Sequence, residues 1–303
     1  MDKCAPLSAL ANNSIGAVDD SLLAATRHPG SRVPLLFAHG FGQTRHSWAG
    51  CAQRLAAHGH PSLAYDARGH GQSPWNPVDL PYQPEQFVDD LIGISGQLPQ
   101  APVLVAASMG GLFGLIAQSR WPGLFSAMVL VDITPRWEPR GVERILAFMS
   151  AHPDGFDDLA HAADEIARYQ PQRERKSDAA LRSILRQDQD GRLRWHWDPR
   201  LLPELGRNAD SHQQRIAEAA RRIQCPLLLI SGGRSDMVSD ATIDEFLQLV
   251  PHARHTRIAG ATHMVAGDDN DAFTTTVMQY LDALPALATD GESATTHLTG
   301  AFQ

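Results

Sequence analysis

Cysteine is scarce in this sequence of 303 residues, which has only Cys4, Cys51 and Cys225. Three cysteines cannot form a fully paired disulfide framework, and so low a number suits a reducing compartment. The N-terminus also lacks a basic segment followed by a long apolar stretch, so the sequence does not predict a signal peptide. No apolar run approaches the length of a membrane span. We therefore expect a cytoplasmic protein that has no membrane partner.

An excess of positive charge is lacking as well. The chain has 26 Lys and Arg residues against 34 Asp and Glu residues, which gives a formal net charge of −8. A nucleic-acid partner would require a basic face, so we expect no such partner. The hydrophobic fraction of 43% and the charged fraction of 20% are typical of a globular protein. The length is sufficient for one large core with an inserted segment.

Patterns that bind metals or phosphates are missing too. The pair His58 and His60 lacks the further His and Asp spacing of a metallohydrolase site. Residues 188–191 begin like a calcium-binding loop, but no glutamate stands at the twelfth position. The chain has no glycine-rich phosphate fingerprint. We therefore expect no metal and no cofactor, and we interpret both segments as turns.

The most informative feature that is present surrounds Ser108. An apolar run at 103–105 precedes it, and a helix-like pattern at 112–117 follows the two glycines after Met109. Small residues two before and two after a serine allow the helix to pack back across the strand. Ala106 and Gly110 meet this requirement, although the usual pattern has glycine at both positions. The segment predicts a serine at a sharp turn beside a helix N-terminus; taken alone, it could also be an ordinary strand–helix turn.

Other segments supply what a serine nucleophile needs, namely a base, an orienting acid and an oxyanion hole. His263 follows the predicted strand 254–258, and Asp236 follows the predicted strand 227–230. The segment 39–42, which contains Phe41, follows the predicted strand 33–38. Each candidate therefore lies at the carboxyl end of a strand, where ligands bind in open α/β sheets.

With these motifs, in the order Ser, Asp, His, the chain resembles the α/β-hydrolase superfamily over roughly residues 15–283. The segment 65–73 is similar to a loop that many members carry after the second parallel strand, in which Asp66 and Arg68 are charged residues. The resemblance implies a mostly parallel sheet with helices on both faces and an inserted helical lid. We interpret Asp66 and Arg68 as residues that fix this loop.

The resemblance also implies roles for individual residues. Ser108 is the expected nucleophile and His263 the base, and the backbone N–H groups of Phe41 and Met109 form the expected oxyanion hole. Asp236 is the expected acid, because the loop that contains it is the commoner supplier in the family. Some members instead use the position that Asp132 occupies, at the end of the predicted strand 127–131, so this residue remains the alternative. His39, beside the oxyanion loop, is usually structural in the family.

The regular alternation of strands and helices defines the expected domains. The core comprises 1–134 and 211–303, with loose tails at 1–14 and 286–303, and begins with an edge hairpin at 14–28. The expected elements are strands at 33–38, 61–65, 103–107, 127–131, 227–230 and 254–258, and helices at 48–58, 83–97, 241–250 and 271–284, together with a helix that follows the strand 103–107 and ends at about residue 120. Residues 135–210 break the pattern and predict a helical lid with helical pieces at 141–150, 159–169 and 178–187 and with no strand.

Four aromatic residues of the lid are candidates for a substrate pocket: Trp137, Phe148, Trp195 and Trp197. They could line an apolar pocket, or they could fix the lid to the core. The resemblance implies a serine hydrolase that cleaves a small or medium carboxylic ester through an acyl-enzyme on Ser108. A lactonase, a thioesterase and a carbon–carbon bond hydrolase would share this triad. A ligand-binding or signalling protein of the same fold, with slow turnover, is the alternative from another class.

Overall fold

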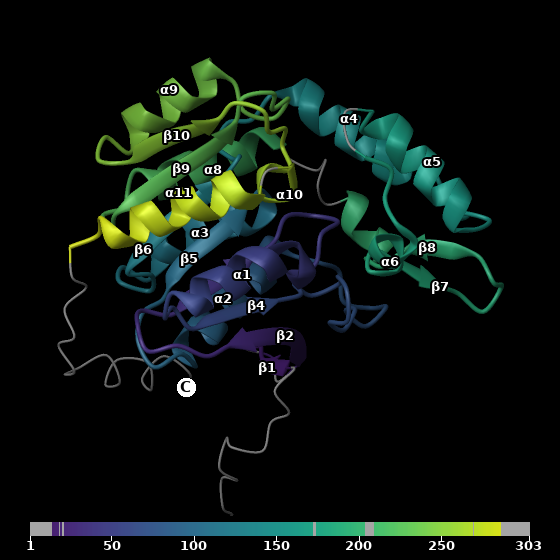
Figure 1. Ribbon diagram of the computed structural model, residues 1–303, viewed down its shortest axis with the longest axis horizontal. Helices are drawn as coiled ribbons and strands as arrows, with labels where there is room; N and C mark the ends of the chain where they lie inside the picture. The colour runs from purple at the N-terminus through teal and green to yellow at the C-terminus, as the bar shows by residue number, and fades with distance from the viewer. Residues whose placement is uncertain are drawn as a thin grey trace, which may run out of the picture.

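An eight-stranded sheet forms the centre of the fold (Figure 1). Its strand order is β1-β2-β4-β3-β5-β6-β9-β10. The computed structural model describes residues 14–17, 19, 21–171, 174–203, 209–268 and 270–285. The predicted tails lie outside these residues, except for Ser14, which begins β1. The strands are β1 (Ser14–Gly16), β2 (Leu22–His28), β3 (Leu35–Ala38), β4 (Ser62–Tyr65), β5 (Val103–Ala107), β6 (Ala127–Val131), β9 (Leu227–Gly232) and β10 (Arg254–Ile258).

The strand directions confirm the predicted mostly parallel sheet. β1 and β2 form the expected antiparallel edge hairpin, and β2 also pairs antiparallel with β4. From β4 through β3, β5, β6 and β9 to β10 every pairing is parallel. Because β3, β5 and β6 are covered on both faces, their sequences are continuous apolar runs, without the alternation of a half-exposed strand.

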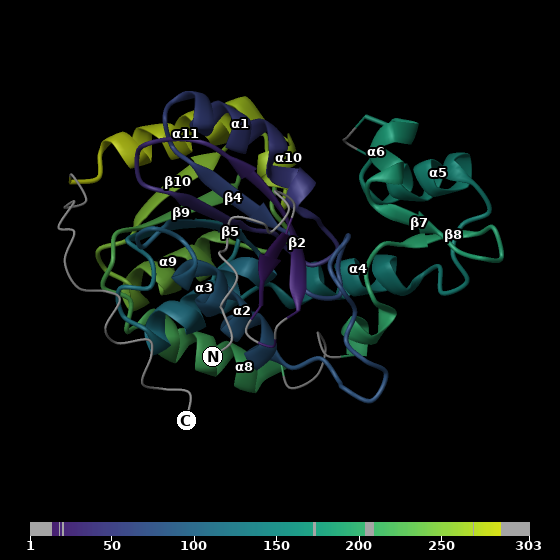
Figure 2. The same ribbon diagram turned by 90° about the horizontal axis from the view of Figure 1, so that it is seen from below.

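Helices cover both faces of the sheet. On one face, α1 (Ala49–Ala57) packs against α11 (Asn270–Asp282). On the other face, α3 (Met109–Arg120) packs between α2 (Pro84–Gly96) and α8 (Ala209–Ala220), as Figures 1 and 2 show. The helix α9 (Asp240–Leu249) contributes Ile243 and Phe246 to the same hydrophobic cluster as α3. Two short helical turns, η2 (Arg45–Trp48) and α10 (Val265–Asp268), lie in loops after strands.

The chain leaves the sheet after β6 and returns to it at β9. In between lie α4 (Pro139–Ser150), α5 (Leu159–Tyr169), α6 (Asp178–Arg182), β7 (Leu185–Gln187), β8 (Leu193–Trp195) and η3 (Pro199–Leu201), followed by α8. We call residues 135–203 the inserted segment. Both ribbon views place α5, α6, β7 and β8 together at one end of the molecule (Figures 1 and 2).

The secondary structure of the inserted segment differs from the expectation in one respect. Residues 178–187 do not form one helix, because α6 ends at Arg182 and β7 pairs antiparallel with β8. In β8 the side chains of Leu193 and Trp195 are buried on one side of the strand, and Arg194 lies between them. This alternation is the period of a strand. The expectation that no strand occurs here was therefore wrong.

No helix in the described ranges combines the length and the apolar character that crossing a membrane would require.

Candidate active site

Ser108 lies at the sharp turn between β5 and α3, with φ 45° and ψ −119°. A non-glycine residue with this φ is strained, which is common at functional sites. The glycines that follow allow α3 to approach the sheet. A Cβ on Gly110 would lie 2.7 Å from the carbonyl oxygen of Ala38, and one on Gly111 would lie 2.8 Å from a methyl carbon of Ile133. The predicted strand–turn–helix arrangement around the serine is therefore confirmed.

Asp132 is the carboxylate that contacts the candidate base. Nδ1 of His263 lies 2.8 Å from Oδ2 of Asp132, and the aspartate side chain is fully buried. The other partners of the carboxylate are the backbone N–H of Gly232, at 2.7 Å from Oδ1, and the hydroxyl of Ser235, which donates to Oδ2. With three donors around it, the carboxylate has a fixed orientation, and it holds the proton of His263 on Nδ1.

The expected pairing of Asp236 with His263 was wrong. The side chain of Asp236 is 37% exposed and forms an ion pair of 2.7 Å with Arg144 of α4. The loop after β9 turns tightly, because the backbone N–H of Ser235 donates to the carbonyl oxygen of Gly232 at 3.3 Å. This turn directs Ser235, and not Asp236, toward the buried carboxylate. The available sequence signal was the position of Asp132 at the end of an apolar strand.

The two residues expected to form the oxyanion hole flank the serine. Phe41 lies in the loop after β3, which comprises residues 39–43 and which we call the oxyanion loop. Met109 is the first residue of α3, where backbone N–H groups have no partner within the helix. In the described part of the chain, no hydrogen bond is donated by the backbone N–H of Phe41 or Met109. Both groups are therefore available to an oxyanion.

His39 fixes the start of the oxyanion loop. Its Nδ1 lies 2.8 Å from the carbonyl oxygen of Gly40, and its Nε2 lies 2.9 Å from the backbone nitrogen of Ala67. Both contacts are satisfied when Nδ1 carries the proton and Nε2 accepts. Burial of the ring lowers the pKa of His39, which favours this neutral form. The structural role expected for this histidine agrees with its contacts.

A cavity of about 170 Å³ extends from Ser108 along α3. Apolar side chains dominate its lining, with a few polar groups among them. The lining residues are Phe41, Tyr82, Gln83, Pro84, Phe87, Ser108, Met109, Leu112, Phe113, Ile116, Ile133, Trp137, Val142, Ile145, Leu146, Leu201, His212, Arg215, Ile216 and Met237. His263 is not among them; it lines a second, more polar cavity of about 200 Å³ with Gln43, Thr44 and Ser183.

Only Trp137 of the four expected pocket residues lines the cavity beside Ser108. Phe148 stacks on Tyr169, with ring centroids 4.0 Å apart. Trp195 packs edge-on against Phe148, and the residue is 9% exposed. Trp197 packs against the ring of Phe41, with the centroids 5.0 Å apart. For these three residues the expected place in the pocket lining was wrong, because their rings pack on other aromatic rings.

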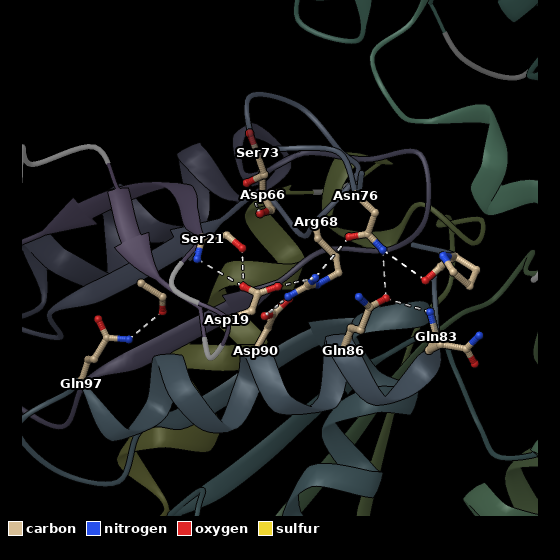
Figure 3. Close-up of polar contacts among 12 residues, drawn as sticks. Asp19, Ser21, Asp66, Arg68, Ser73, Asn76, Gln83, Gln86, Asp90 and Gln97 are labelled. Atoms are coloured by element: carbon tan, nitrogen blue, oxygen red, sulfur yellow. Dashed lines mark hydrogen bonds and ion pairs between the residues drawn. The ribbon is translucent and has the colours of Figure 1, made fainter. Parts of the chain in front are cut away.

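The charges of the loop 66–73 pair with residues outside the loop. Asp66 is fully buried and forms an ion pair with Arg45 of η2. Arg68 forms two hydrogen bonds with the carboxylate of Asp90 in α2, at 2.6 and 2.7 Å. Figure 3 shows that Arg68 points into a cluster that also contains Asp19 and Asn76. The two charges connect the loop to η2, α2 and the edge hairpin, which agrees with the fixing role that the sequence suggested.

No group of three or more His, Cys, Asp and Glu side chains within the described ranges could hold a metal ion.

Known proteins resemble this chain over most of its length. A sequence model described as the alpha/beta hydrolase family matches residues 35–276. An esterase of Mycobacterium tuberculosis is 29% identical over 280 residues, which are 88% of either chain. A crystal structure of that esterase has a TM-score of 0.70, with 26% identity over 88% of this chain and 90% of the other. An esterase of Escherichia coli is 27% identical over 253 residues, 82% of this chain and 93% of that protein.

A third relative carries a different name. The 2-(acetamidomethylene)succinate hydrolase of Mesorhizobium japonicum is 24% identical over 258 residues, 85% of this chain and 91% of that protein. A crystal structure of an enzyme with this activity has a TM-score of 0.77 and 23% identity, and it covers 89% of this chain and 99% of the other. At that identity, the structural likeness concerns the fold alone.

Proposed function

This chain belongs to the alpha/beta hydrolase family, and from that membership we propose that it is a serine hydrolase that cleaves a carboxylic ester with an apolar acyl group. The observation that carries the proposal is the position of Ser108, which lies at a strained turn and lines an apolar cavity. Relatives named as esterases support ester hydrolysis as the reaction.

The proposed reaction uses the contacts of His263. Asp132 holds the proton on Nδ1, so Nε2 has a lone pair that can take the proton of the Ser108 hydroxyl. The serine oxygen then attacks the ester carbonyl, and the N–H groups of Phe41 and Met109 bind the resulting oxyanion. The imidazolium returns its proton to the leaving alcohol, and an acyl-enzyme remains. Water, activated by the same histidine, then attacks this ester and releases the acid.

The acyl group of the proposed substrate occupies the cavity along α3. Leu112, Phe113 and Ile116 lie on one face of that helix and line the cavity. Arg215 also lines it, but its guanidinium forms an ion pair of 2.7 Å with Glu85. Because this cation already has a carboxylate partner, the cavity favours an apolar acyl chain over one that ends in a carboxylate.

We also propose that residues 135–210 act as a lid over the cavity. Trp137, Val142, Ile145 and Leu146 from the first part of the inserted segment, together with Leu201 from its end, contribute to the cavity lining. A cover of apolar side chains would exclude water and limit the size of the acyl group.

The cytoplasm remains the proposed compartment. Cys51 and Cys225 are free thiols, and burial raises the pKa of each to about 12, so neither is prone to react as a thiolate. The support for a reducing environment is the low number of cysteines in the sequence.

Covalent labelling tests the proposed function. A fluorophosphonate should label the wild-type chain once, at Ser108, and Ser108→Ala should take no label. With short-chain aryl esters the wild type should show a burst followed by steady turnover. Ser108→Ala should lose about 10⁴-fold or more in kcat and keep its melting temperature. Labelling without turnover would instead indicate a ligand-binding protein, and full activity of Ser108→Ala would exclude the acyl-enzyme.

A further inference from the structure

Two consecutive residues of the inserted segment contact two consecutive residues of the oxyanion loop. Nε2 of His196 lies 3.1 Å from the carbonyl oxygen of Gly42. The indole of Trp197 packs on the ring of Phe41, with centroids 5.0 Å apart. Both side chains from the inserted segment are buried, at 5% and 3% exposed. The inserted segment is therefore in direct contact with the loop that presents one of the two oxyanion-hole N–H groups.

The imidazole of His196 bridges two loops. Nδ1 accepts a hydrogen bond from the backbone N–H of Gly71 at 2.7 Å, while the ring nitrogen on the opposite side reaches Gly42. One tautomer satisfies both contacts, with the proton on Nε2. Gly42 and Gly71 have φ values of +72° and +56°, in the left-handed region that favours glycine. The ring thus joins two tight turns, one in the oxyanion loop and one in the loop 66–73.

The charge state of His196 supports this arrangement. The pKa of His196 is lowered to about 4, mainly by burial and to a smaller extent by the nearby His39, whereas the hydrogen bond to the carbonyl of Gly42 and the charge of Asp66 oppose the shift. His70, the other titratable ring in contact, also has its pKa lowered by burial. The neutral ring therefore persists at pH 7, with one donor and one acceptor.

Histidines hold the oxyanion loop on both sides of Phe41. His39, from the core, binds the carbonyl of Gly40, the same peptide unit that contains the N–H of Phe41. His196, from the inserted segment, binds the carbonyl of Gly42. Because a peptide unit is planar, fixing the carbonyl of Gly40 fixes the direction of the N–H of Phe41. Fixing the carbonyl of Gly42 limits how far the backbone on the other side of Phe41 can move.

We propose that His196 is a positioning residue for the oxyanion hole, through which docking of the inserted segment sets the rate of the chemical step. The inference rests on the proposed function, because an oxyanion hole has a role only where an oxyanion forms. The segment would then do more than cover the cavity: the N–H of Phe41 is held in place when residues 196 and 197 are docked.

Three variants separate this role from a merely structural one. His196→Gln keeps one acceptor and one donor in a side chain of similar reach. His196→Phe keeps the ring and removes both hydrogen bonds, and the shorter His196→Asn serves if His196→Phe does not fold. The matched control is Phe156→Leu, a fully buried residue of the same segment that packs on Trp195 and His161 and forms no ring contact with Phe41. It should destabilise the segment without moving the oxyanion loop.

Each variant should be compared by kcat, KM and the inhibition constant of an aryl trifluoromethyl ketone, which forms a tetrahedral oxyanion on a serine. Removal of a whole oxyanion donor costs about 10²- to 10³-fold in kcat. For a displaced donor we expect His196→Phe to lower kcat by about 10- to 100-fold, to weaken the ketone in parallel, and to leave KM within about threefold. His196→Gln should restore most of both losses, and Phe156→Leu should lower only the melting temperature.

The results that would overturn the positioning role of His196 differ from those that would overturn the proposed function. The positioning role would be overturned if His196→Phe had the kcat and the ketone affinity of the wild type. It would also be overturned if Phe156→Leu lost as much kcat and ketone affinity as His196→Phe. A wild-type chain that hydrolyses no ester and takes no fluorophosphonate label would overturn the proposed function, and the inference with it. An active, labelled wild type with unaffected His196 variants would overturn the inference alone.

Discussion

Nδ1 of His263 donates a hydrogen bond of 2.8 Å to Oδ2 of Asp132, a residue that precedes it by 131 positions. The carboxylate follows β6, which lies between the serine strand β5 and β9 in the sheet. It is therefore close both to the turn of Ser108 and to the loop of Ser235, which also donates to it. This contact fixes the tautomer of the histidine and leads to a prediction that separates the two candidate acids.

Asp132→Asn should lower kcat by about 10³- to 10⁴-fold, because an amide cannot hold the histidine in the required tautomer. Asp236→Asn should change kcat by less than about threefold, since the side chain of Asp236 is 37% exposed and pairs with Arg144, whereas the partner of His263 is Asp132. Steady-state kinetics on one aryl ester, with circular dichroism to verify folding, provide the comparison. An inactive Asp236→Asn beside an active Asp132→Asn would reverse the assignment.

Gly40→Ala should slow the acylation of Ser108. A Cβ at position 40 would lie 3.1 Å from the Cβ of Ser108 and 3.3 Å from Oε1 of Gln43, so the oxyanion loop or the serine must shift. A misplacement of about 1 Å can cost on the order of 10²-fold, and we expect a loss of about 10-fold or more in the rate of fluorophosphonate labelling.

The matched control for this prediction is Gly260→Ala, because a Cβ on Gly260 would have no neighbour within 4 Å. Its labelling rate should equal that of the wild type. Equal rates in both variants would show that the space between Gly40 and Ser108 does not constrain the reaction.

Trp137→Ala should change the preference for acyl chain length. Trp137 lines the cavity beside Ser108, and the loss of one methylene contact in a pocket costs about 1 to 3 kcal/mol. The ratio of kcat/KM between a long and a short acyl ester should therefore shift by about tenfold or more. Trp195→Ala is the control, because Trp195 packs on Phe148 and Phe156 outside the cavity. It should lower the melting temperature and leave the ratio unchanged; a shift in the control alone would contradict the lining that we describe.

Acidification should destabilise the protein through its buried histidines. Burial lowers the pKa of His39 and His70, and it lowers that of His196 to about 4. Between pH 6.5 and about 4 the unfolded chain therefore binds a proton at position 196 that the folded protein does not bind. Stability then rises with pH in this window, by at most about 1.4 kcal/mol per pH unit for each such histidine.

Urea unfolding at several pH values between about 5 and 7 measures this dependence. His196→Gln removes one of the protons, so the free energy of unfolding should depend less steeply on pH in this variant. His58→Gln is a suitable control, because His58 is exposed at the end of α1. An unchanged slope in His196→Gln would show that the ring at position 196 is protonated equally in both states.

Local patterns were sufficient to predict much of the fold. The turn at Ser108, the alternation of buried strands and helices, and the edge hairpin all follow from short-range signals. The hairpin β7–β8 was missed because its strands have three residues each, too few for a strand period to be distinct from a helical one. The aromatic residues of the inserted segment were ambiguous for a related reason, since apolar side chains fit a pocket wall and a packed interface equally well.

Sequence patterns were enough to predict a serine at a sharp turn, a histidine after the last strand, and an insertion that interrupts the alternation of strands and helices. The three-dimensional structure was needed to show which aspartate contacts the histidine. The strand order places Asp132 next to both loops, whereas the turn after β9 directs Asp236 toward Arg144. The structure also shows that His196 bonds to Gly42 across 154 positions. Contacts of this kind depend on how loops that follow different strands are placed relative to one another. A short-range sequence pattern does not predict that placement.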